Sequence, residues 1–165
     1  AEVHPGDCVF EVGAGMGSLT LGLLNAGARV IAAEVDYRLA KRLHKTVGEM
    51  PASEQLAQNL CILEQNALTV FQQEFLNAGV RAPNKMVSNL PYNIAVPVIF
   101  HTLWNFPSIK TLFVMVQKEI GDRLCQRVDV NGVNKSAVGQ KIAYFGCAKL
   151  EGDVSREVFW PKPGV

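Results

Sequence analysis

CVFEVGAGMGSLTLGLLNAG, residues 8–27, is the stretch that decides the fold. The apolar run 8–12 predicts a buried strand, and 18–27 predicts a helix that ends at Gly27. Three glycines at alternate positions separate them: Gly13, Gly15 and Gly17. Glycine permits a tight turn and lets a ligand approach the main chain. The stretch predicts either a ligand-binding turn between strand and helix or a glycine-rich turn without a ligand.

The same order of signals recurs along the chain. Further apolar runs predict strands at 29–35, 60–65, 84–89 and 111–117. Helical patterns follow these strands at 37–47, 70–79, 95–104 and 118–128. Five alternations predict an α/β fold with a mostly parallel sheet covered by helices on both faces.

Two segments depart from this alternation. Residues 141–160 hold two β-like stretches on either side of Gly152 and Asp153, which predict an antiparallel hairpin that finishes the sheet. Residues 48–58 are polar and predict a loop insertion.

The composition is that of a soluble domain. The chain has 165 residues, 48% of them hydrophobic, which suffices for one domain with a buried core. No apolar run approaches the roughly 18 residues of a membrane span, and no leader sequence is visible. Four separate cysteines without a CxxC pair are expected to be reduced thiols in the cytoplasm. The net charge is +1, but residues 81–165 carry 11 basic and 6 acidic groups, so this half either faces phosphate or presents solvated helix faces.

Polar residues follow several of the predicted strands. Glu34 ends the second strand, 21 residues after Gly13, where a carboxylate can accept hydrogen bonds from ribose hydroxyls. Asp36 is a competing carboxylate, and Glu34 is preferred by its position. Asn66 follows the third strand, and NLPY, residues 89–92, follows the fourth. Ligands of such folds gather beyond the carboxyl ends of the strands, so these groups are expected to share one crevice.

Five motifs in order, EVGAGMG, AAEVD, NLPYNI, FVMVQKEIGDRL and FWPKPGV, resemble the catalytic domain of the ribosomal RNA adenine N6,N6-dimethyltransferases. The resemblance covers nearly the whole chain, taken as one domain over 1–165. It implies a Rossmann-like S-adenosylmethionine-dependent methyltransferase fold with seven strands. It implies an enzyme that dimethylates two adjacent adenosines near the 3′ end of small-subunit rRNA. It also implies a cytoplasmic monomer that acts on the pre-30S particle.

The resemblance implies a role for particular residues. The cofactor, S-adenosylmethionine, is expected to contact Glu11, Gly13, Gly15, Gly17, Glu34, Val35, Asn66, Ala67 and Asn89. The catalytic residues are expected to be Asn89, Leu90, Pro91, Tyr92 and Phe159, with Trp160 as the alternative to Phe159.

The expected chemistry requires positioning rather than a shifted base or a metal. The lone pair of the adenine amino nitrogen is delocalised into the ring, and two acceptors on its hydrogens can favour a localised pair. The Asn89 side-chain oxygen and the Leu90 carbonyl are the acceptors that the resemblance implies. Pro91 stiffens the turn, and the Tyr92 ring offers a stacking face worth roughly 1–3 kcal/mol. The isolated histidines form no metal or triad pattern, so no metal is expected.

This chain departs from the family in three places. QNA stands where members usually carry an acidic residue, so Asn66 can accept a hydrogen bond but carries no charge. The N-terminal segment and the C-terminal helical domain of the family are absent, which indicates a fragment.

Three other functions remain open from the residues alone. The first is a large-subunit rRNA adenine methyltransferase of the macrolide-resistance type, and the second is a methyltransferase acting on a protein glutamine amide. The third is a ribosome-assembly or transcription factor that keeps the fold without catalysis.

Overall fold

A computed structural model describes residues 1–125 and 136–158 of the chain. The chain divides into two compact units, Ala1–Val116 and Gln117–Val165. The elements of the first unit are, in order, β1 (Cys8–Val12), α1 (Ser18–Asn25), β2 (Arg29–Ala33), α2 (Tyr37–Gly48), α3 (Ser53–Gln58), β3 (Leu60–Leu63), η1 (Ala67–Thr69), α4 (Gln72–Asn77), β4 (Lys85–Asn89), α5 (Ala95–Asn105) and β5 (Thr111–Met115). Those of the second unit are α6 (Lys118–Leu124), α7 (Ala137–Phe145) and η2 (Arg156–Val158).

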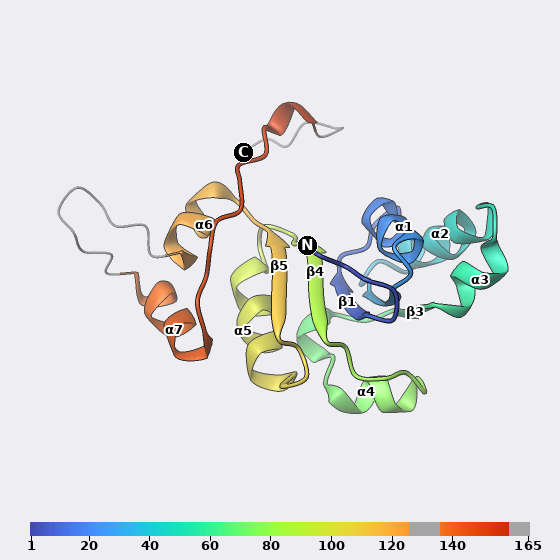
Figure 1. The fold of residues 1–165 in the computed structure, drawn as a ribbon, viewed down its shortest axis with the longest axis horizontal. Helices are drawn as coiled ribbons and strands as arrows, with labels where there is room; N and C mark the ends of the chain where they lie inside the picture. The colour runs from blue at the N-terminus through green and yellow to red at the C-terminus, as the bar shows by residue number, and fades with distance from the viewer. Residues whose placement is uncertain (126–135, 159–165) are drawn as a thin grey trace. The chain divides into compact units, whose positions relative to one another are not determined.

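The strands of the first unit form one parallel sheet in the order β3-β2-β1-β4-β5 (Figure 1). The chain moves outward in one direction from β1 to β3 and then crosses back to place β4 on the other side of β1. The connection that follows β1 and the connection that leads to β4 therefore run to opposite sides of β1. In an open α/β sheet such a point leaves a crevice at the carboxyl ends of the two strands, where ligands bind.

Alternate residues of the strands build a core on each face of the sheet. Val9 and Val30 pair across β1 and β2 and join a buried cluster with Leu23 of α1 and Leu43 of α2. Phe10, the next residue of β1, has no exposed surface and belongs to the other face. Burial on both faces explains why the strands are nearly continuous apolar runs.

Three phenylalanines form the centre of the second core. The ring of Phe10 lies 5.7 Å from that of Phe75 in α4 and 5.5 Å from that of Phe106 after α5. The rings of Phe75 and Phe106 lie 5.1 Å apart. The two pairs that include Phe10 are edge-to-face, and such pairs add about 0.5–1.5 kcal/mol each beyond the area they bury. The cluster fixes α4 and the C-terminal end of α5 on this face of the sheet.

The α/β fold with a parallel sheet is confirmed, but the predicted C-terminal hairpin is wrong in the described residues. Residues 141–145, which lie in the first of its two predicted stretches, belong to helix α7, where the Ser136 hydroxyl caps the helix by accepting from Gly139 N (3.4 Å). Residues 146–155 form no strand, and η2 follows them. Within 1–125 and 136–158 the sheet has five strands, not seven. The segment 48–58 also differs from its predicted loop, since it contains α3.

Candidate functional site

The glycine turn after β1 lies directly against the NLPY segment after β4. Gly13 has φ of +73°, which favours glycine, and its amide donates to the Ala33 carbonyl at 2.9 Å. A Cβ atom at Gly13 would come within 3.2 Å of Pro91 Cγ and 3.3 Å of Pro91 Cδ. Gly13 therefore allows two segments separated by more than 70 residues to meet at the point where the strand order reverses.

Gly17 brings the start of α1 close to α2. Its φ is +92°, and a Cβ atom there would lie 2.5 Å from Leu43 Cδ1. Any other residue would therefore be strained and would displace a buried leucine of the core.

Glu34 ties the glycine turn to the end of β2. Its side chain is 5% exposed, Oε2 accepts from Gly15 N at 2.9 Å, and Oε1 accepts from Asp36 N at 3.0 Å. Each oxygen keeps a further lone pair, so the carboxylate can still accept a ligand hydroxyl. Asp36 is engaged elsewhere, because it caps α2 and its hydrogen bond with Arg38 lowers the pKa of that carboxyl to about 2. The role of Glu34 rather than Asp36 in binding a ribose stays a prediction, and the contact of Asp36 with Arg38 favours it.

Glu11 is a buried carboxyl residue of β1, directly before the glycine turn. It is 2% exposed, and its Oε2 accepts from the Thr20 hydroxyl at 2.7 Å. Burial raises the pKa of Glu11 to about 7, with the Thr20 hydrogen bond acting against this and the Glu34 charge adding to it. Its predicted contact with a cofactor stays a prediction, since the carboxylate is directed at α1.

Ser88 is a residue that the sequence analysis missed. The pairing of β1 with β4 joins Val9 to Lys85 and Phe10 to Met86, and beyond it the Val12 amide donates to Ser88 Oγ at 2.9 Å. The Ser88 side chain thus replaces main-chain hydrogen bonding between β1 and β4 at the point where these two strands separate. A small hydroxyl side chain directly after the apolar pair Met86 and Val87 was the available signal.

The NLPY segment forms a turn with its second residue buried and the others exposed. Leu90 is 1% exposed, and its amide donates to the Met115 carbonyl at 3.1 Å. The Ile94 amide donates to the Pro91 carbonyl at 3.1 Å and closes the turn. Asn89 is exposed, and within the described residues its side chain has no protein hydrogen bond. Tyr92 is 41% exposed, so the ring is not part of the core.

The segment after β3 presents Asn66 at the same edge of the sheet. Asn66 is exposed, and its Oδ1 accepts from Leu68 N at 3.0 Å, which caps η1. The next residue, Ala67, is 5% exposed.

Large apolar side chains are exposed after three of the strands. Met16, in the glycine turn, is 55% exposed, and Val35, after Glu34, is 73% exposed. Tyr92 follows β4. Apolar side chains with a few polar groups are common in binding sites for small molecules.

One expected site residue lies beyond these observations. Phe159, the predicted second aromatic wall, and its alternative Trp160 fall outside the described residues. Over 1–125 and 136–158, the acidic, histidine and cysteine side chains form no cluster suited to a metal ion. None of the helices in these ranges is long and apolar enough to pass through a membrane.

Comparison with known structures supports a methyltransferase fold. A dimethyladenosine transferase from Plasmodium falciparum aligns over 99% of this chain and 54% of its own, with a TM-score of 0.69 and 24% identity. The 23S rRNA methyltransferase ErmE aligns over 76% of this chain and 46% of its own, with a TM-score of 0.60 and 26% identity. The fold is thus that of the Rossmann-like methyltransferases.

Sequence comparison defines the family. The model of the ribosomal RNA adenine dimethylases matches residues 1–165, and the chain belongs to this family. It is 42% identical to the ribosomal RNA small subunit methyltransferase A of Leifsonia xyli, covering 100% of this chain and 55% of the relative. The enzyme of the same name from Mycobacterium avium is 44% identical, with 99% and 49% covered. The chain spans about half the length of these curated relatives. The resemblance inferred from the motifs is confirmed.

Proposed function

We propose that the protein uses S-adenosylmethionine to dimethylate N6 of two adjacent adenosines near the 3′ end of small-subunit rRNA. The observation that carries this proposal is the contact between the glycine turn and the NLPY segment at the reversal of strand order. It brings a nucleoside-binding turn and an amino-group-binding turn to one crevice. The family and the names of its 41–44% identical relatives support the substrate class. We further propose that residues 1–165 act as one catalytic domain of a cytoplasmic monomer that binds the pre-30S particle.

The residues of the crevice fit this cofactor. The absence of a side chain at Gly13 lets the glycine turn meet the NLPY segment, and Glu34 offers buried acceptor oxygens suited to ribose hydroxyls. Val35 and Met16 offer exposed apolar surface suited to a base. When bound, S-adenosylmethionine supplies the electrophilic methyl group.

The residues after β4 orient the target amino group. The free Asn89 oxygen and the Leu90 carbonyl accept its two hydrogens and favour a localised nitrogen lone pair. The exposed Tyr92 ring stacks on the turned-out adenine, which offsets part of the loss of base stacking in the RNA. The amino proton becomes acidic as the nitrogen gains the methyl group, so it passes to water without a dedicated base. Catalysis then depends on positioning.

Asn66 is proposed to keep the cofactor contact that an acidic residue makes in other members. Its amide can accept a hydrogen bond but contributes no charge. We expect weaker cofactor binding, by on the order of 1 kcal/mol, than with aspartate.

The test supplies labelled S-adenosylmethionine and unmethylated small subunits to the protein, and dimethyladenosine is then quantified. Label in two adjacent adenosines is expected. Asn89→Ala should reduce the rate of methyl transfer by on the order of 100-fold, because one positioning group is lost. The melting temperature should not change. Asn25→Ala, which replaces an exposed asparagine at the end of α1, is the matched control. An unaffected Asn89→Ala rate would refute the role of this side chain. Preferential label in naked large-subunit RNA would refute the substrate.

A further inference from the structure

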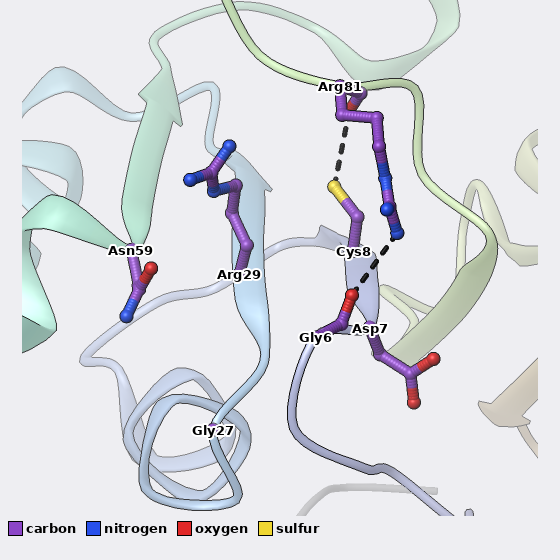
Figure 2. A pocket seen from close by; sticks show the side chains of 7 residues that line it. All are labelled: Gly6, Asp7, Cys8, Gly27, Arg29, Asn59 and Arg81. Carbon is purple, nitrogen blue, oxygen red and sulfur yellow. Dashed lines mark hydrogen bonds between the residues drawn. The ribbon is translucent and has the colours of Figure 1, made fainter.

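A hollow lies at the edge of the sheet opposite to the glycine turn. It has a volume of about 220 Å³, and its lining includes Cys8 at the start of β1 and Arg29 at the start of β2. Arg81, in the connection before β4, and Asn59, before β3, also line it (Figure 2). All of these residues precede their strands or begin them, whereas the cofactor-binding turn follows β1. The hollow is therefore separate from the methyl-transfer site.

Two arginines approach this hollow from different elements. Figure 2 shows the side chains of Arg29 and Arg81 on the two sides of Cys8. Burial raises the pKa of the Cys8 thiol, and the charges of Arg81 and Arg29 both act against this rise. The positive charges of Arg29 and Arg81 thus both act at Cys8, which lines the hollow.

These positive charges lack a protein counter-ion. The carboxylate at the rim, Asp7, is occupied by Lys85 Nζ at 2.7 Å and by Asn84 Nδ2 at 2.8 Å. Arg81 donates one hydrogen bond, to the Gly6 carbonyl at 3.1 Å. Across the residues that the structure describes, neither Arg29 nor Arg81 forms an ion pair, and both are exposed. The hollow therefore carries an uncompensated positive charge.

The remaining hydrogen-bond donors suit a phosphate group. A guanidinium offers two parallel N–H groups whose spacing matches two oxygens of a phosphate. Arg29 has no hydrogen bond to the described residues through its side chain, and the same holds for the Asn59 amide. The main-chain groups nearby are already used, since Arg29 N donates to Asp7 O at 2.8 Å and Asn59 O accepts from Val30 N at 2.7 Å. The donors available to a ligand are therefore side chains.

We propose that this hollow binds a backbone phosphate of the RNA substrate and so anchors the RNA away from the methyl-transfer site. The proposal rests on the proposed function, because that function supplies a polyanion as the substrate. A large RNA needs contacts that fix its position without reading its sequence, and phosphate contacts provide these.

The test compares Arg29→Gln with the wild-type protein in binding to transcribed small-subunit rRNA over a range of salt concentrations. Arg81→Gln is the second variant, and Arg42→Gln, which removes an exposed arginine from α2, is the matched control. Loss of one phosphate contact is expected to weaken RNA binding by roughly threefold to tenfold and to lower the salt slope by about 1. Affinity for S-adenosylmethionine should be unchanged, which also shows that the variants fold.

A parallel titration with inorganic phosphate at constant ionic strength separates RNA from a free anion. Unchanged RNA affinity and salt slope in both hollow variants would overturn the proposal. An equal loss in Arg42→Gln would overturn it too, because the effect would then be general charge. Phosphate binding that depends on Arg29, with unaltered RNA binding, would assign the hollow to a small anion instead. Methyl transfer by the wild-type protein tests the proposed function separately, since it does not depend on these variants.

Discussion

Replacing Glu11 by glutamine is expected to stabilise the protein increasingly as the pH rises. Burial raises the pKa of Glu11 from 4.5 to about 7, so the folded protein holds a proton that the unfolded chain has released. The stability provided by this proton is fully present below pH 4.5 and is lost as the pH rises through about 7. With about 1.4 kcal/mol per pKa unit, the loss is about 3 kcal/mol at pH 8. Glutamine resembles the protonated acid at every pH and avoids this loss.

Urea unfolding of both proteins at pH 5 and pH 8, without cofactor, measures the difference. At pH 5, where the wild-type protein has begun to lose this stability, the Glu11→Gln variant should be more stable by only about 1 kcal/mol. At pH 8 the Glu11→Gln variant should be more stable by about 3 kcal/mol, which raises the midpoint by roughly 1–3 M urea at an unchanged m-value. The amide can also keep a hydrogen bond to the Thr20 hydroxyl, which limits the cost of the exchange.

The control variant is Glu54→Gln, which removes an exposed carboxylate from α3. It should show no comparable gain between the two pH values. A Glu11→Gln variant that is destabilised equally at pH 5 and pH 8 would contradict the raised pKa. The carboxylate would then be ionised in the folded state and stabilised by its surroundings.

Three further predictions follow from the site and its surroundings. Gly17→Ala should lower the free energy of unfolding by about 1–3 kcal/mol, because it combines a positive φ with a clash against Leu43, and an unaltered urea midpoint would contradict this. Lys85→Met should raise the pKa of Asp7, which the Lys85 hydrogen bond holds below its usual range, and a ¹³C NMR titration of the carboxyl would detect it. Tyr92→Ala should reduce kcat/KM by roughly 5- to 150-fold through loss of stacking, whereas Tyr92→Phe should retain most activity; equal losses would indicate a role for the hydroxyl.

Much of the fold could be predicted because its signals are local. The strands are apolar runs of about five residues, and turn residues or helical patterns separate them, so periodicity identifies each element. The meeting of Gly13 with the NLPY segment could be predicted for the same reason, since parallel strands bring their carboxyl ends to one edge. Gly13, Glu34 and the NLPY segment each follow a strand. The close approach of Gly13 to Pro91 shows that two of these segments are in contact.

The remaining features depend on contacts that sequence periodicity does not encode. In α7, the apolar and aromatic residues at 141–145 resemble a strand, but a cap at Ser136 starts a helix ahead of them. The burial of Glu11 depends on the packing of α1, and the role of Ser88 depends on where β1 and β4 part. In each case a tertiary contact, absent from local sequence, decides the outcome.

Asn66 illustrates how an expected site residue can differ in charge without a change of the backbone. Its Oδ1 caps η1 by accepting from Leu68 N, and both asparagine and aspartate make this bond well. An exchange between aspartate and asparagine at position 66 therefore leaves the turn after β3 in place. It alters only the charge that this residue presents to a ligand. Oδ1 retains a second lone pair that can accept from the amino group of an adenine. An Asn66→Asp variant should then bind S-adenosylmethionine several-fold more tightly at an unchanged melting temperature. A large change in stability with unchanged affinity would mean that this residue serves the turn alone.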